Sequence, residues 1–146
     1  MPNPQIDPRG ARVAAALTSL VLAVVLLTAP GPLALALLAA QTAVFAIGAV
    51  SGVQHTPYSL LFRTLLRPRL GPPAELEDAA PPRFAQAVGL GFASVGLVAL
   101  AAGATTVGLV AVGFALAAAL LNATTGFCLG CELYLLTKRV VPATSN

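Results

Sequence analysis

Four long apolar stretches, separated by polar or proline- and glycine-containing breaks, dominate this chain. They cover residues 13–29, 33–53, 84–102 and 107–136. A helix needs roughly 20 mostly apolar residues to cross a bilayer, so the pattern predicts four membrane-spanning helices. We therefore expect an all-α integral membrane protein, a four-helix bundle in which residues 1–146 form a single membrane domain.

The composition supports a membrane protein. Hydrophobic residues make up 58% of the chain and charged residues only 9%, whereas soluble domains carry roughly 25% charged residues. The net charge is +3, but few aromatic residues are interleaved with the basic ones, which argues against a nucleic-acid-binding surface.

The basic residues predict the orientation in the membrane. All eight lie before the first stretch, in the segment 54–83 or after the last stretch: Arg9, Arg12, Arg63, Arg67, Arg69, Arg83, Lys138 and Arg139. The turns at 30–32 and 103–106 contain none. By the positive-inside rule, both termini and the segment 54–83 are expected to be cytoplasmic. A cleaved signal peptide is the alternative explanation of the first stretch, although this stretch is longer than a usual signal-peptide core.

The polar segment 54–83 contains a short amphipathic pattern. Leucines alternate with Arg63 and Arg67 at helical spacing, which predicts a helix over residues 57–66 that lies on anionic lipid. Prolines at 68, 72 and 73 are expected to end this helix.

The last apolar stretch is too long for a simple span. Its 30 residues (107–136) would extend about 45 Å as one helix, against a hydrocarbon core of roughly 30 Å. The polar and glycine residues from Asn122 to Gly126 mark the expected break or kink. Broken membrane helices are tolerated where they border protein or a water-filled cavity, and they often mark binding sites.

The chain has only two cysteines, Cys128 and Cys131, and both follow the expected break. Their spacing is that of thiol–disulfide motifs, in which the start of a helix stabilises the first thiolate. Counting back along a continuous helix from Lys138 places them about 10 to 15 Å inside the inner leaflet. Two small buried hydrophobic residues are the alternative interpretation. Without a second cysteine pair, a structural zinc site has little support.

Three further residues are candidates for the same site. Glu132 could transfer protons to or from a thiol, or could pair with Lys138 or Arg139 at the membrane surface. His55 could reach the thiols as a base or metal ligand if the second and fourth spans are neighbours, or could be an interfacial histidine. Asn122 could bind a ligand or hydrogen-bond to another helix. The identity of any metal is unknown from the sequence.

Glycines recur at helical spacing within the spans. Gly48 and Gly52, and also Gly126 and Gly130, form the GxxxG pattern. Small residues at this spacing let membrane helices approach closely. They favour a tight bundle and leave open a homodimer.

The chain resembles the bacterial membrane family catalogued as domain of unknown function 4395, which is common in actinobacteria. The matching motifs are Asp7-Pro-Arg9, Pro57-Tyr58 with Arg67-Pro-Arg69-Leu-Gly-Pro-Pro73, the segment 77–86, and Asn122 to Glu132. The resemblance implies a small four-span protein whose cysteine motif falls on Cys128 and Cys131. Its members often look associated with thioredoxin-like or rhodanese-like proteins, which implies thiol or sulfur chemistry.

Three functions follow as expectations. The first is thiol–disulfide exchange or sulfur-species handling by Cys128, Cys131 and Glu132 with a thioredoxin-like or rhodanese-like partner. No cofactor is evident from the sequence, although one thiol pair needs a quinone, a movement or a second copy to pass electrons across a membrane. The alternatives are a small transporter of a sulfur species or metal ion, and a non-catalytic assembly subunit. The sequence does not decide whether the protein is an enzyme.

Overall fold

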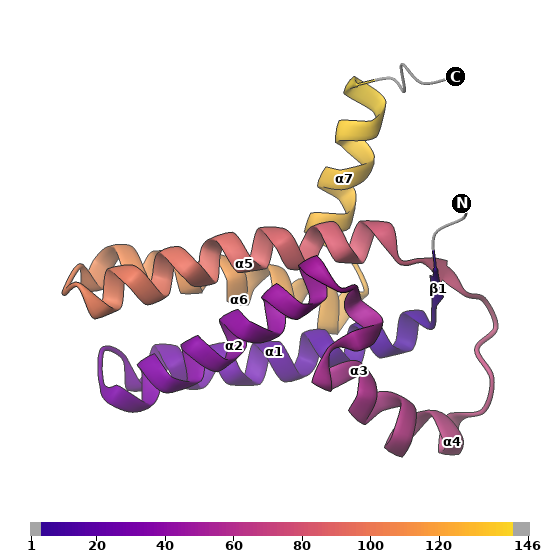
Figure 1. The fold of residues 1–146 in the computed structure, drawn as a ribbon, viewed down its shortest axis with the longest axis horizontal. Coiled ribbons are helices and arrows are strands. Elements are labelled where there is room, and N and C mark those ends of the chain that lie inside the picture. The colour runs from indigo at the N-terminus through magenta and orange to yellow at the C-terminus, as the bar shows by residue number, and fades with distance from the viewer. Residues whose placement is uncertain (1–3, 142–146) are drawn as a thin grey trace.

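The computed structural model describes residues 4–141 and contains four long helices, each antiparallel to the one before it in the sequence (Figure 1). They are α1 (Pro8–Thr28), α2 (Pro32–Val50), α5 (Ala80–Ala101) and α6 (Thr105–Thr125). Each is long and apolar enough to cross a membrane. The predicted all-α bundle with four spanning helices is therefore confirmed, and the chain is a multi-pass membrane protein.

The four helices form a ring. α1 packs against α2 and α6, and α5 packs against α2 and α6, so that α2 and α6 lie diagonally across the bundle. Leu22, Leu38, Ala93 and Val112, one from each helix, are fully buried at its centre. α5 and α6 approach closely because Gly96 and Gly108 face each other: a Cβ added at Gly108 would lie 3.2 Å from the carbonyl oxygen of Gly96.

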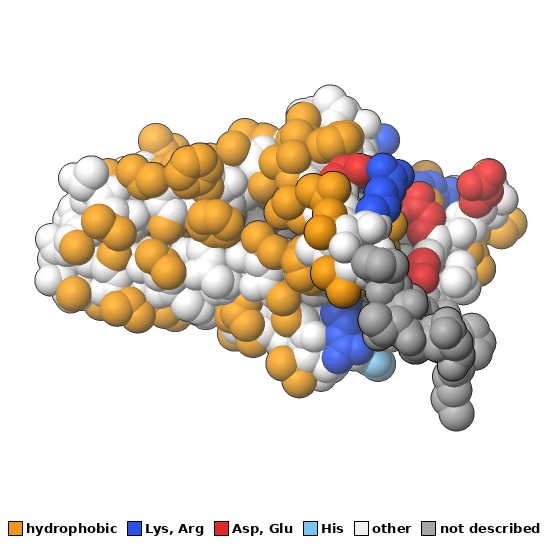
Figure 2. All heavy atoms as spheres, turned by 90° about the horizontal axis from the view of Figure 1, so that it is seen from above, with side chains coloured by type: hydrophobic (Ala, Val, Ile, Leu, Met, Phe, Trp, Pro, Cys, Tyr) orange, Lys and Arg blue, Asp and Glu red, His pale blue; other side chains and the backbone are white. Residues whose placement is uncertain are grey.

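Charged side chains gather at one end of the bundle, and the opposite end and the sides are apolar or small (Figure 2). The charged end is where α1 and α5 begin and where α2 and α6 end. The one-sided distribution of charge along the sequence is therefore also one-sided in space. The terminal residues 1–3 and 142–146 lie outside the described residues.

Two arginines cap the helices that end at the charged side. Arg83 on α5 donates from Nε to Ala49 O at 2.8 Å and from Nη2 to Val50 O at 2.5 Å, at the last turn of α2. Arg12 on α1 donates in the same way to the last turn of α6. The last carbonyls of a helix lack intrahelical partners, and a cation there also complements the helix dipole. Each arginine therefore stabilises the C-terminus of a neighbouring helix.

The segment between α2 and α5 is helical over a longer range than predicted. A 3₁₀ turn (Val53–His55) leads into α3 (Pro57–Leu61), a π-helical turn (Phe62–Leu66) and α4 (Arg67–Leu70). Phe62 is 2% exposed and packs on Gly10 of α1, where an added Cβ would lie 3.0 Å from its ring. Leu60 and Leu65 remain exposed, as expected for a helix at a lipid surface.

The prediction that Pro68 ends this helix is wrong because of the π-helical turn. The N–H of Arg67 bonds to the carbonyl of Phe62, five residues back. A π turn adds one residue to the helical turn. The added residue accommodates a proline that would clash with the carbonyl four residues back in a regular α-helix.

A two-stranded ribbon ties the N-terminus to the start of α5. β1 (Gln5–Ile6) pairs antiparallel with β2 (Glu77–Asp78). The next residue, Asp7, caps α1 by accepting from the N–H of Arg9 at 3.0 Å, and it forms an ion pair with the Arg9 guanidinium. Hydrogen bonding from the Arg9 side chain lowers the pKa of Asp7, although burial opposes the shift.

Candidate functional site

The predicted break in the last apolar stretch is present. α6 ends at Thr125, and Gly126 follows in the left-handed conformation (φ 78°), with its N–H bonded to Asn122 O at 2.8 Å. Glycine adopts this conformation without a steric penalty and commonly terminates helices. α7 (Leu129–Val140) then turns away from the bundle (Figure 1).

The break changes where the cysteines are expected to lie. α6 alone has 21 residues, or about 32 Å of helix, which is enough to cross the hydrocarbon core. Cys128 and Cys131 come after the end of α6, at the charged end of the bundle. The depth of the two cysteines in the membrane is therefore set by where α6 ends. The count back from Lys138 does not apply, because it assumed one continuous helix.

The two cysteines form a disulfide at the start of α7, with their Cα atoms 5.1 Å apart. Cys128 is the N-cap residue of α7, and its Sγ accepts a hydrogen bond from the N–H of Cys131 at 3.1 Å. When the pair is reduced, this N–H and the positive end of the helix dipole favour the thiolate of Cys128. The geometry therefore distinguishes the two sulfurs.

Arg12 adds a positive charge to this region. Its Nη2 donates to Ala123 O and Thr124 O, both at 3.1 Å, and its side chain lies within 3.8 to 3.9 Å of the position of a Cβ on Gly126. A neighbouring cation favours a thiolate. In the sequence Arg12 directly precedes the first apolar stretch and counts only as one of the charges that predict the topology. Nothing in the hydrophobic pattern separates it from the other basic residues, so its contact with the end of α6 was not predicted.

Arg12→Gln is expected to make reduced Cys128 less reactive. Glutamine keeps a donor for the α6 carbonyls but removes the charge, so the alkylation rate at neutral pH is expected to fall about tenfold, equivalent to roughly one pH unit in its profile. Iodoacetamide labelling of the reduced protein as a function of pH measures this. Arg69→Gln, on the exposed α4, is the control. An alkylation profile identical to that of the wild type would rule out an electrostatic role of Arg12.

α7 is held in place mainly by α5. A Cβ added at Gly130 would lie 2.5 Å from Ala85 Cβ and 2.6 Å from Ala85 Cα, so the two helices are in close contact. Phe84 of α5 packs against Tyr134, with 5.8 Å between ring centroids, and Lys138 Nζ lies 5.7 Å from the centroid of the Tyr134 ring. The position of the cysteine pair thus depends on this docking.

A cavity of about 710 Å³ lies between the helices beside the cysteines. Its lining includes both cysteines and Arg12, and it extends to Thr18 of α1 and Phe45 of α2. The site therefore combines the disulfide with a chamber that reaches into the bundle.

Four amide side chains line the cavity: Gln5, Gln54 and, on the spanning helices, Gln86 of α5 and Asn122 of α6. Neither Gln86 nor Asn122 has a side-chain hydrogen-bond partner among residues 4–141, and both are half-buried. Gln86 packs on Gly48, where an added Cβ would lie 2.6 Å from Gln86 Oε1. The predicted hydrogen bond from Asn122 to another helix is not formed. Both amides are thus available to a ligand.

A buried polar chain borders the same cavity. The hydroxyl of Tyr58 donates to Gln41 Oε1 at 2.7 Å, and Gln41 Nε2 donates to Thr18 Oγ1 at 3.5 Å. Burial raises the pKa of Tyr58 above its ordinary value. Tyr58 therefore remains a neutral donor and fixes α3 against α1 and α2.

Of the other two predicted site residues, His55 lies away from the cysteines and Glu132 lies beside Cys131 but outside the cavity. His55 is exposed on the 3₁₀ turn after α2, which is diagonal to α6, and it does not line the cavity. Glu132 is on α7, one turn after Cys128, but it is exposed and forms no ion pair within the described chain. Residues 4–141 contain no cluster of three or more His, Cys, Asp or Glu that could hold a metal ion.

Residues 6–139 match the family described as Domain of unknown function (DUF4395). The chain belongs to this family. The DUF4395 match includes all four spanning helices, the cysteine pair and nearly all of α7. It confirms the resemblance inferred from the sequence motifs. No curated protein and no solved structure matches the chain.

Proposed function

We propose that this protein exchanges disulfides with a thiol-bearing partner at the cytoplasmic boundary of a bacterial plasma membrane. One observation carries the proposal: Cys128, disulfide-bonded to Cys131, caps the N-terminus of α7 two residues after Gly126, which lies beside Arg12. Helix N-termini and cations are the features that make a cysteine reactive. The basic residues at the same end support a cytoplasmic orientation.

The exchange proceeds through a mixed disulfide. A thiolate of the partner attacks Cys128 Sγ, and Cys131 leaves as the thiolate. A second partner thiol then attacks the mixed disulfide and releases Cys128, so the partner is oxidised and Cys128 and Cys131 are reduced. Glu132, exposed one turn beyond Cys128, is the nearest carboxylate along α7 to take up or return protons. A cytosolic thioredoxin-like or rhodanese-like protein has the required chemistry.

The test is the redox state of the cysteine pair in cells. Membranes are quenched with acid and alkylated with a mass-tagged maleimide, in cells with and without an active thioredoxin system. We expect the pair to shift between oxidised and reduced forms. A pair that has the same redox state in both strains would contradict exchange with a thioredoxin-like partner.

The cavity supports a second candidate, transport of a sulfur species. It holds about 710 Å³ beside the cysteines, and the amides of Gln86 and Asn122 in its lining have no hydrogen-bond partners in the described chain. Transport predicts sulfide or thiosulfate flux into vesicles that depends on Asn122 and on the thiols and proceeds without a disulfide cycle. Vesicles that contain the purified protein and show no flux above empty vesicles would exclude it.

A further inference from the structure

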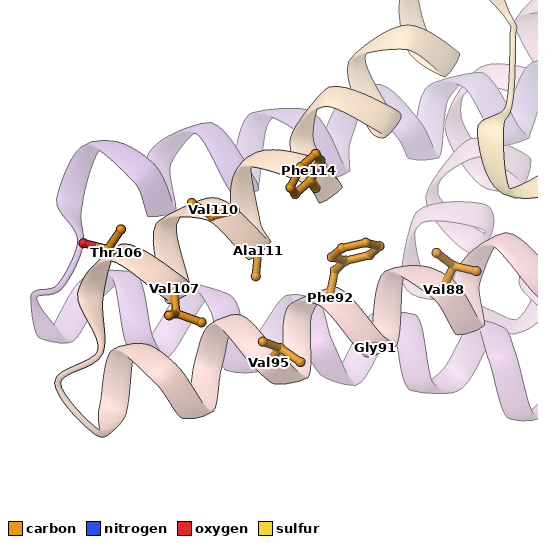
Figure 3. Close-up of a pocket in the computed structure, with 9 residues that line it drawn as sticks. All are labelled: Val88, Gly91, Phe92, Val95, Thr106, Val107, Val110, Ala111 and Phe114. Atoms are coloured by element: carbon orange, nitrogen blue, oxygen red, sulfur yellow. The ribbon is translucent and has the colours of Figure 1, made fainter.

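An apolar groove of about 580 Å³ runs along the outside of the bundle between α5 and α6 (Figure 3). Its lining consists of valines, phenylalanines, alanine and glycine, with Thr106 as the one hydroxyl-bearing residue. Both helices are membrane spans, so the groove faces the hydrocarbon region. A molecule that occupies the groove must therefore be dissolved in the bilayer.

The groove and the internal cavity share part of their walls. Val88 and Phe92 of α5 and Phe114 of α6 line both. The rings of Phe92 and Phe114 face each other across the two helices, with centroids 6.0 Å apart (Figure 3). Phe114 is 61% exposed and Phe92 is 39% exposed. A single layer of side chains thus separates lipid from the chamber that contains the cysteines.

Exposed side chains such as those of Phe92 and Phe114 can change rotamer. Such rotations in exposed residues occur within nanoseconds. Gly91 leaves further room beside Phe92, since no atom lies within 4 Å of a Cβ added there. We call the wall formed by Val88, Phe92 and Phe114 between groove and cavity the seam between α5 and α6. Rotation of its phenylalanine side chains can admit a flat ring without separation of the two helices.

The inner side of the seam is polar. Gln86 lies on α5 and Asn122 on α6, the same two helices that form the groove, and both amides line the cavity without hydrogen-bond partners in the described chain. Amide N–H groups are suitable donors to carbonyl oxygens. A ring with carbonyl groups and an apolar tail matches this combination of chamber and groove.

We propose that the seam between α5 and α6 is a lateral entrance for a lipid-soluble quinone, which reoxidises the cysteine pair. This inference rests on the proposed disulfide exchange, because exchange with a reduced partner leaves both thiols reduced. The chain has no other cysteines to accept their electrons. A bond forms between Cys128 Sγ and Cys131 Sγ, and two electrons and two protons pass to the quinone. Its two carbonyls become hydroxyls, and the quinol leaves through the groove.

The experiment uses the full-length protein, reduced and freed of reductant, in detergent. The probe is a benzoquinone substituted at every ring carbon, so that thiols cannot add to the ring, supplied either with a ten-carbon tail or with a methyl group in its place. We expect the tailed quinone to oxidise the thiols about tenfold faster, because its tail occupies the apolar groove. One quinol, measured by absorbance, is expected for each disulfide formed.

Variants at the seam distinguish an effect on quinone entry from an effect on the oxidation of the thiols. Phe114→Trp fills the seam with a larger side chain. The tailed quinone is therefore expected to oxidise the thiols of this variant about fivefold more slowly, because it enters the cavity less easily. Val98→Trp, on the exposed face of α5 outside both linings, is the matched control. Phe114→Ala, which widens the seam, serves if the tryptophan variant misfolds, and its rate with the tailed quinone is expected to rise. Asn122→Leu is expected to slow oxidation by both quinones.

The outcomes distinguish this inference from the proposed function. Equal rates for the two quinones, or rates that do not depend on residue 114, would overturn the lateral entrance. Thiols that exchange with a dithiol partner but produce no quinol would overturn the quinone while disulfide exchange stands. Quinol formation without any exchange with a dithiol protein would refute the proposed partner reaction and support the entrance.

Discussion

Cys131→Ser is expected to accumulate a mixed disulfide between Cys128 and its partner protein, whereas Cys128→Ser is expected to form none. Cys128 caps α7, and its sulfur accepts the N–H of Cys131. In the reverse direction of the exchange, these interactions favour attack of the Cys128 thiolate on an oxidised partner. Without Cys131 the chain has no second thiol to resolve the resulting mixed disulfide. The double Cys→Ser variant is expected to lose exchange completely.

The measurement is non-reducing electrophoresis of acid-quenched membranes, followed by mass spectrometry of any slower-migrating species. The adduct must disappear on reduction and be absent from the double variant. Trapping through Cys131 in the Cys128→Ser variant would reverse the assignment of the two cysteines. Exchange that persists in the double variant would exclude the proposed chemistry.

Gly130→Ala is expected to displace α7 and to slow disulfide exchange about tenfold or more, with a loss of roughly 1 to 3 kcal/mol of stability through overpacking. The added Cβ would lie 2.5 Å from Ala85 Cβ and 2.6 Å from Ala85 Cα. The Cα is a backbone atom of a spanning helix, so α7 must move instead. The cysteine pair then moves relative to Arg12 and the cavity.

Thermal unfolding in detergent and the exchange rate measure the two effects of Gly130→Ala. Gly113→Ala on α6 is the matched control, because no atom lies within 4 Å of its added Cβ. Adding Ala85→Gly removes the 2.5 Å contact and leaves the 2.6 Å contact, so rescue is expected to be partial. Wild-type exchange in Gly130→Ala would show that docking of α7 on α5 does not position the cysteines.

Hydrophobic pattern and charge placement were sufficient to predict the bundle. Backbone N–H and C=O groups in the bilayer must form hydrogen bonds within the protein. A stretch of about 20 apolar residues is therefore expected to form a membrane-spanning helix. The break after α6 was predictable for the same reason, since 30 apolar residues exceed the membrane thickness and Gly126 can terminate a helix. These features depend on local sequence alone.

The order of the helices around the ring was not predictable from the pattern. His55 was a candidate only if α2 and α6 were neighbours, and they are diagonal. The docking of α7 likewise depends on the contact between Gly130 and Ala85, which are far apart in sequence. The polar lining of the cavity, including Gln86, follows from this arrangement. Contacts between helices depend on side-chain shape, which hydropathy does not describe.

The arginine caps connect the two halves of the bundle, and this has a consequence for how the protein folds during synthesis. α1 and α2 form one hairpin, and α5 and α6 form the other. Each hairpin's first helix supplies the arginine that satisfies the last carbonyls of the other hairpin's second helix: Arg12 reaches α6 and Arg83 reaches α2. The last carbonyls of α2 therefore lack these donors until α5 has been synthesised and has packed against α2. The two halves of the chain mature together, once synthesis has delivered both.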